Sequence, residues 1–360
     1  MKELKRGAPE LDFIRLTSTN PRLSSMNQYS GPALEAFARE LAGAANSLAQ
    51  HPRRLAGVRA EAVFRTVVMG IGDVVLLKEE DEGSVAYRGD EVAVPDFRLV
   101  LRDGRQLLVE VKRHEFAGDL CREFSISDRR VRALRRYAEL TGAELRFAIF
   151  WEPLGKWTLS ELRAFAAGEQ GERQWRISFP SAYATNTMAD LGDYIVAVPA
   201  PLRLRIVADP SADNPVVEAD GKKTTHFTIQ RVELLADNFV LKGISQQIAW
   251  RLIWYGEWDE WPVELKDEGG QLVHVDIPFG PPVPEDHAGP IGSHPAGALS
   301  DMISRCYLQG ASATVHTTSE SEVLHPGYMG RDFIPSNWTE LGLDMPLAKF
   351  YMRPNYAFEK

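Results

Sequence analysis

Two short β-forming segments, Val94–Leu101 and Gln106–Lys112, constrain this chain more than any other feature. The four residues between them, Arg102-Asp103-Gly104-Arg105, contain an Asp-Gly pair, which is a strong signal for a tight hairpin turn. Side chains alternate along a strand, so Glu110 and Lys112 are expected on one face and Val109 and Val111 on the other. The turn is expected to bring Asp96 beside Glu110. The segment therefore predicts a hairpin that presents two carboxylates and an ammonium group on one surface.

The segments around this hairpin predict a mixed α/β layer structure. Apolar spacing predicts helices over Pro32–Gln50 and Leu55–Met69, the second ending at Gly70 and Gly72, and then a short buried strand over Val74–Leu77. After the hairpin, Ser127 or Asp128 is expected to cap a helix that runs to Leu140 and ends at Thr141-Gly142. Leu145–Trp151 is expected to be a buried strand. The expected order is helix, strand, hairpin, helix, strand.

Two adjacent carboxylates repel each other unless a cation lies between them, and hard oxygen ligands suit Mg²⁺ or Mn²⁺. The motif Pro95-Asp96, a spacer of thirteen residues, and Glu110-Val111-Lys112 resembles that of the PD-(D/E)xK, or restriction-endonuclease-like, nucleases. The resemblance covers about residues 55–152. It implies a mixed sheet flanked by helices and a metal-dependent endonuclease acting on DNA, in restriction, phage defence or repair, with RNA not excluded.

The resemblance also implies roles for individual residues. Asp96 and Glu110 are expected to bind the metal together with the backbone carbonyl of Val111, and Lys112 is expected to help activate water and offset phosphate charge. Glu61, on the preceding helix, matches a further acid of the family and is expected as a catalytic residue and metal ligand. Its alternative is an exposed ion pair with Arg65, four residues along the helix.

Positive charge gathers on the predicted helix that follows the hairpin. Arg129, Arg130, Arg132 and Arg136 are candidate phosphate contacts, together with Arg135, and His114 is a candidate contact at the strand end. The alternative for the arginines is a solvated helix face paired with Asp128 and Glu139. For the whole motif the alternatives are a surface hairpin with a Glu–Lys pair, or a non-catalytic nucleic-acid-binding or assembly protein that keeps the fold.

Length and charge predict a second module. The 360 residues exceed one typical domain, and residues 256–360 hold six Lys and Arg against sixteen Asp and Glu, a net charge of −10. We expect an irregular segment at 1–29, a nuclease-like domain at 30–170, a connecting region at 171–223 and an acidic, mixed α+β domain at 224–360. That last domain is expected to meet a protein partner or to regulate access to the nuclease, rather than to bind nucleic acid.

Sequence features also bear on the compartment and on the remaining elements. Only two cysteines occur, and no apolar run of 18 residues or more is present, so a cytoplasmic protein without a membrane span is expected. A helix is expected near 160–167, a loop at 209–223, and irregular chain at 280–297. A helix over Ile244–Tyr255 and a hairpin around Gly269-Gly270 complete the expectations, with packing preferred over base stacking for the tryptophans 250, 254, 258 and 261.

Overall fold

The computed structural model describes residues 52–80, 86–119, 121–167, 173–282, 293–315, 333–334 and 341–358, together with 35, 39, 42 and 43. Those four isolated residues are helical, and the rest of the helix predicted over Pro32–Gln50 lies outside the described residues. The expected irregular segment at 1–29 also lies outside them. No helix in the described ranges is long and apolar enough to cross a membrane.

A five-stranded mixed sheet forms the part of the molecule that contains the hairpin. Its strand order is β1-β2-β3-β5-β6, with β3 and β5 parallel and the other neighbours antiparallel. The strands are β1 (Val74–Glu79), β2 (Phe97–Leu101), β3 (Gln106–His114), β5 (Glu144–Trp151) and β6 (Lys156–Ser160). Helix α3 (Pro52–Gly70) precedes this sheet, and α4 (Asp128–Thr141) connects β3 to β5. The predicted order of elements is confirmed.

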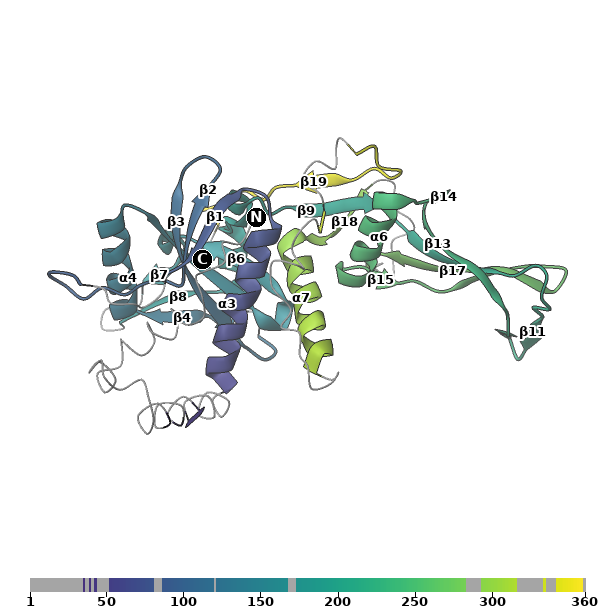
Figure 1. Cartoon of the computed structure of the whole chain (residues 1–360), viewed down its shortest axis with the longest axis horizontal. Helices are drawn as coiled ribbons and strands as arrows, with labels where there is room; N and C mark the ends of the chain where they lie inside the picture. The colour runs from purple at the N-terminus through teal and green to yellow at the C-terminus, as the bar shows by residue number, and fades with distance from the viewer. Residues whose placement is uncertain are drawn as a thin grey trace.

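The alternation of β3 divides the surroundings of the sheet into two apolar layers. Val109 and Val111 belong to the larger cluster of buried residues, which includes Val63, Phe64 and Val67 of α3. The smaller cluster contains Val131 and Leu134 of α4 with Phe147 and Ile149 of β5. Figure 1 shows α3 and α4 beside this sheet. Each helix thus covers apolar side chains that the sheet presents.

Local sequence signals explain the ends of these elements. The turn between β2 and β3 places Gly104 at φ +87°, a conformation that L side chains rarely adopt, as the Asp-Gly pair predicted. Ser127 caps α4 by accepting a hydrogen bond from the N–H of Arg130 at 3.3 Å. Gly142 ends α4 in the left-handed conformation. These local predictions are confirmed.

A second, six-stranded antiparallel sheet forms an elongated arm (Figure 1). Its order is β14-β13-β10-β17-β15, and β16 also pairs with β17. Its strands are β10 (Leu202–Ala208), β13 (Ile229–Ala236), β14 (Phe239–Val240), β15 (Asp259–Glu260), β16 (Glu264–Glu268) and β17 (Gln271–Gly280). The predicted hairpin around Gly269-Gly270 is the β16–β17 turn. A small hairpin of β11 (Val216–Ala219) and β12 (Lys222–Thr225) extends from the arm.

The remaining described elements are two small sheets and several helices and 3-10 turns. Two three-stranded sheets have the orders β18-β9-β19 and β4-β8-β7. Their strands are β4 (Phe124–Ser127), β7 (Ala166–Ala167), β8 (Gln174–Ile177), β9 (Ile195–Pro199), β18 (Ser293–Ala298) and β19 (Ala348–Phe350). The helices are α5 (Phe179–Ala184), α6 (Gly243–Tyr255), α7 (Leu299–Val315) and the 3-10 turns η1 (Glu152–Leu154), η2 (Leu162–Ala164) and η3 (Met188–Leu191). The helix predicted over Ile244–Tyr255 is confirmed as α6.

Helix α7 packs beside α3, so residues far apart in the sequence share one core (Figure 1). The larger cluster of buried residues contains Val67 and Val68 of α3 and also Met302 and Ile303 of α7. The residue boundaries proposed for the domains stay a prediction. The packing nevertheless shows that segments on both sides of the connecting region bury their apolar side chains together.

Polar contacts also hold α7 against the first sheet. The Lys156 ammonium lies 3.0 Å from Oδ2 of Asp301 and forms a second ion pair with Glu257. Asp193 accepts hydrogen bonds from the N–H and hydroxyl of Ser300, at 2.9 and 2.6 Å. We call these residues (Lys156, Asp193, Glu257, Ser300 and Asp301) the α7 junction. Burial raises the pKa of Asp193 to about 7.

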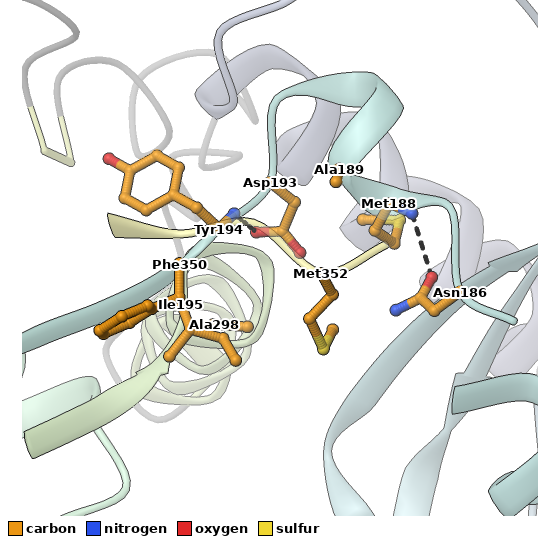
Figure 2. A pocket seen from close by; sticks show the side chains of 9 residues that line it. All are labelled: Asn186, Met188, Ala189, Asp193, Tyr194, Ile195, Ala298, Phe350 and Met352. Carbon is orange, nitrogen blue, oxygen red and sulfur yellow. Dashed lines mark hydrogen bonds between the residues drawn. The ribbon is translucent and has the colours of Figure 1, made fainter. Parts of the chain in front are cut away.

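A narrow cavity borders this junction on the β9 and η3 side (Figure 2). Figure 2 shows the Asp193 carboxylate beside it, accepting the N–H of Tyr194 at 3.0 Å. Other lining residues are largely apolar, among them Ile195, Phe350 and Met352. None of the residues that line the cavity belongs to the hairpin described above.

Four sequence-based expectations are wrong in detail. The strand predicted as buried near Val74 is an edge strand, because among the described strands it pairs with β2 alone, and Val75 and Leu76 are about half exposed. The segment 160–167 is not an α-helix but ends β6 and contains η2 and β7. The segment 209–223 contains β11 and the start of β12 rather than a loop alone. Within 280–297, residues 293–297 belong to β18, whose pairing with β9 overrides a Pro- and Gly-containing sequence.

The four tryptophans near α6 lie in different environments. Trp250 and Trp254 stack with ring centroids 6.3 Å apart, but Trp254 is 64% exposed. Trp258 is buried and donates its indole N–H to the carbonyl of Pro295. Trp261 is partly buried and donates its indole N–H to the carbonyl of Pro281 at 3.2 Å. The predicted packing role therefore fits Trp258 and, in part, Trp250 and Trp261, whereas Trp254 faces solvent.

Candidate active site

The hairpin brings the Asp96 and Glu110 carboxylates together at the start of β2. Phe97 pairs with Val109, so Asp96 lies one step further along, beside Glu110. The N–H of Val111 donates to Oδ2 of Asp96 at 2.6 Å, which fixes the carboxylate against β3. On the β1 side, the N–H of Glu80 donates to the carbonyl of Asp96 at 3.0 Å. Asp96 is thus held by both neighbouring strands.

Glu110 is fully buried, and Lys112 lies on the same face of β3. The Lys112 ammonium is 2.7 Å from Oε1 of Glu110 and also donates to the carbonyl of Val111 at 3.0 Å. The Lys112 side chain is 35% exposed, so its charge is close to solvent. A buried carboxylate needs charged or hydrogen-bonding partners, and Lys112 is the first of these.

Arg130, in the first turn of α4, is the second partner of Glu110. Its Nε donates to Oε1 and its Nη2 to Oε2, both at 3.1 Å, which is the bidentate geometry that guanidinium and carboxylate groups favour. Nη2 also donates to the carbonyl of Val94 at 3.3 Å, just before Pro95-Asp96. We call Asp96, Glu110, Lys112 and Arg130 the hairpin site.

Burial and like charge perturb the acids of this site. Burial, followed by the neighbouring Glu110 charge, raises the pKa of Asp96 to about 6 despite the opposing effects of Lys112 and the Val111 N–H. Glu61, partly buried on α3, has its pKa raised by burial and by Glu110, with Lys112 acting in the opposite direction. Glu61 therefore lies in the same electrostatic neighbourhood as the hairpin site. Arg65 forms an ion pair with Glu79 at 2.9 Å, and the role of Glu61 stays a prediction.

The donor chemistry of this site fits a divalent cation. Asp96, Glu110 and the Val111 carbonyl offer oxygen ligands, which Mg²⁺ and Mn²⁺ prefer. Asp96 and Glu110 are also two neighbouring acids that a cation would stabilise, as the raised pKa of Asp96 indicates. Within the described residues, however, no three Asp, Glu, His or Cys side chains converge as a ready-made metal cluster.

The arginines of α4 that are predicted to contact phosphate fall into two groups: three form exposed ion pairs, and one contacts the buried Glu110. Arg129 forms a bidentate pair with Glu91 at 2.8 Å, Arg132 pairs with Asp128 at 3.1 Å, and Arg136 pairs with Glu139 at 3.7 Å. These three side chains are at least 40% exposed. Among the described ion pairs of α4, only that of Arg130 reaches the hairpin site.

His114 lies among aromatic rings at the end of β3. Its ring is 5.2 Å from that of Trp151 and 5.4 Å from that of Phe116, and its Nε2 is 3.2 Å from the carbonyl of Arg122. Burial lowers the pKa of His114. These contacts give the imidazole a packing role, while its proposed contact with nucleic acid stays a prediction.

Sequence reasoning missed the contact of Arg130 with Glu110 and the contacts of Glu80, whose N–H donates to the carbonyl of Asp96. Arg130 was grouped with the other arginines, although its spacing of four from the buried Leu134 places it on the inner face of α4. Glu80 belongs to no motif of the sequence, and its carboxylate contacts Arg98 at 2.6 Å and Tyr137 at 2.8 Å. Burial would raise the pKa of Glu80, and these hydrogen bonds lower it overall. No sequence signal separates Glu80 from its neighbour Glu79.

Comparisons with known proteins add little to these residues. No family model matches the chain, and no curated protein matches it. A solved structure of Hjc, a Holliday junction resolvase from the archaeal hyperthermophile Archaeoglobus fulgidus, is similar over 34% of this chain and 88% of the resolvase. The identity is 16% and the TM-score is 0.24, which is too low to support a conclusion about fold or activity. The assignment below therefore depends on the residues and contacts of this chain.

Proposed function

We propose that this protein is a nuclease of the PD-(D/E)xK type that hydrolyses phosphodiester bonds of DNA with Mg²⁺ or Mn²⁺. The observation that supports this most is the shared face of Glu110 and Lys112, with Asp96 beside them and held by the Val111 N–H. The order α3, β1, β2, β3, α4, β5 agrees with the fold that this motif implies. Restriction, phage defence and repair all remain within this proposal.

In this proposal each residue of the site has a distinct task. Asp96, Glu110 and the Val111 carbonyl would hold the cation, with Glu61 as a further acid approaching from α3. The bound cation supplies a water of lowered pKa and stabilises negative charge on the phosphate. Lys112, with its partly exposed ammonium, orients the attacking water and offsets charge as it develops. The exposed arginines 129, 132 and 136 are candidate contacts for the DNA backbone.

A non-catalytic DNA-binding or assembly protein is the competing function. Burying Glu110 completely carries a desolvation cost that only its charged partners offset. An apolar residue at position 110 would serve a scaffold at least as well, since replacing a buried ion pair by packed apolar side chains is often neutral or stabilising. The buried acid beside Asp96 therefore favours catalysis.

One set of incubations tests the proposed function. Supercoiled, linear and single-stranded DNA, and an RNA of matched sequence, are incubated with Mg²⁺, Mn²⁺, Ca²⁺ or a chelator. We expect cutting of DNA with Mg²⁺ or Mn²⁺ and none with chelator. Lys112→Ala should abolish cutting, whereas Lys222→Ala, on the exposed hairpin of the arm, should cut like the wild type. Equal cutting by wild type and Lys112→Ala would overturn the proposal.

A further inference from the structure

Glu110 has two cationic partners, and the second comes from outside the sequence motif. Oε1 accepts from Lys112 and from Nε of Arg130, and Oε2 accepts from Nη2 of Arg130. A carboxylate offers about four lone-pair positions, so these contacts use three of them. A divalent cation that binds Glu110 must therefore share or displace the guanidinium.

The charges of the hairpin site are balanced in this arrangement. Asp96 and Glu110 are two potential negative charges, and Lys112 and Arg130 are two positive ones. A cation that joins this set meets two like charges within a few ångströms of its ligands, which opposes its binding. If Arg130 left Glu110, one of those charges would be removed from the ligands. The exchange of one cation for another keeps the buried carboxylate neutralised throughout.

The position of Arg130 allows such an exchange. Glu110 is fully buried on a central strand, whereas the side chains of Arg130 and Lys112 are each 35% exposed. Arg130 therefore has a long, partly exposed side chain that reaches from the first turn of α4 to the buried carboxylate of Glu110. Its neighbours Arg129 and Arg132 on the same turn face outward, toward the surface that the proposed function assigns to DNA.

We propose that Arg130 is an exchangeable counter-ion of Glu110. It neutralises Glu110 while this carboxylate carries no metal, and it turns to a non-bridging oxygen of the scissile phosphate when Glu110 binds the divalent cation. This inference rests on the proposed nuclease function, which it extends by a further phosphate-binding residue. It also couples metal binding to the arrival of DNA, since the phosphate offers the displaced guanidinium a new anionic partner.

Replacing Arg130 by Gln tests this exchange through two effects of opposite sign. Without DNA, Mn²⁺ should bind Arg130→Gln about tenfold more tightly than wild type, because a charge-assisted competitor for Glu110 is gone. With DNA and saturating Mn²⁺, cleavage should fall by about 10²-fold, because a cation on the phosphate is lost. Mn²⁺ affinity is read by calorimetry on the full chain, and cleavage by gel assay. Lys222→Gln, on the exposed hairpin of the arm, should change neither quantity by more than about twofold.

A purely structural role for Arg130 gives a different pattern. If Arg130 only holds α4 and Val94 in place, Arg130→Gln should bind Mn²⁺ more weakly and cut more slowly together, and this result would overturn the exchange. Arg130→Lys keeps the charge and loses the bidentate fork, so it should give an intermediate Mn²⁺ affinity if Gln proves too disruptive to fold. A wild-type protein that never cuts would refute the proposed nuclease, yet tighter Mn²⁺ binding by Arg130→Gln would still support the exchange.

Discussion

The hairpin site and the α7 junction both bury acidic side chains, but they neutralise them in different ways. Glu110 is paired with Lys112 and Arg130, whose side chains are each 35% exposed. At the α7 junction, Asp301 is 3% exposed and is paired with Lys156, 145 residues earlier in the chain, which is only 22% exposed. Asp193 accepts the N–H and hydroxyl of Ser300 instead of a cation.

This difference in exposure gives the partners of Glu110 more access to solvent than the partner of Asp301 has. Lys112 and Arg130 can leave Glu110 toward solvent without moving any strand or helix. Lys156 is less exposed and also pairs with Glu257, and Ser300 and Asp301 lie in the first turn of α7, so these contacts tie that helix to its surroundings. Exposure of the partner, rather than burial of the acid, therefore distinguishes a candidate binding site from a structural contact.

The largest expected effect concerns the α7 junction. Lys156→Met leaves Asp301 buried without its cation, which should lower the free energy of unfolding by about 3–5 kcal/mol. Chemical denaturation measures this loss, and Lys222→Met on the exposed β12 serves as control. The stabilisation that Mn²⁺ gives to the folded variant should match that of wild type. A loss below about 1 kcal/mol would show that the two kinds of buried acid do not differ as described.

At the hairpin site the large effect should fall on cleavage instead. Lys112→Ala is expected to slow DNA cleavage by at least ~10²-fold, the effect of losing one group that stabilises the transition state. Its unfolding free energy should change by only about 1 kcal/mol, because Lys112 is partly exposed and Arg130 still pairs with Glu110. Denaturation and cleavage are measured on the same preparation. If Lys112→Ala lowered the free energy of unfolding as much as Lys156→Met, the hairpin site and the α7 junction would not differ in how they neutralise their buried acids.

Asp96→Asn should give a smaller effect with a defined pH dependence. The pKa of Asp96 is raised to about 6 in the folded protein, so its contribution to stability is complete below about pH 4 and is lost as pH rises through 6. In the absence of metal, the Asn variant should therefore be more stable than wild type by about 1–3 kcal/mol at pH 8. The two proteins should converge near pH 4. Denaturation curves across this range decide the matter, and a variant less stable at pH 8 would contradict it.

The smallest expected effect is on the exposed arginines of α4. Arg132→Gln should change stability by no more than about 0.5 kcal/mol, since exposed ion pairs contribute little. If Arg132 contacts DNA, the variant should also lose about one unit of the salt dependence of binding. A titration with catalytically inert Ca²⁺ at several salt concentrations measures this slope. An unchanged slope would assign Arg132 to the solvated helix face.

The parts of the fold that sequence could predict depend on local signals. The Asp103-Gly104 turn sets the pairing of β2 with β3, and that pairing alone brings Asp96 to Glu110. Ser127 and Gly142 mark both ends of α4. Each of these signals lies within a few residues of the turn or helix end that it specifies, so it can be recognised from the sequence without knowing the tertiary structure.

The remainder depends on contacts between distant segments. Arg130 was read as one of a row of exposed arginines, because its partner Glu110 lies twenty residues away on another element. Lys156 and Asp301 gave no signal at all, since neither lies in a motif. The proline-containing strand β18 forms because β9 supplies a partner and not because of its own propensity.

The packing of α3 against α7 determines which segments of this protein must be kept together when the chain is shortened or fused to another. The helix that carries Glu61 is supported by Met302 and Ile303, more than two hundred residues later in the chain. A designer who transplanted only the first sheet and its hairpin would leave one side of α3 facing water. The hairpin site and α3 are therefore not expected to fold as a separate unit. A gene fusion that retains this part of the fold must also include α7.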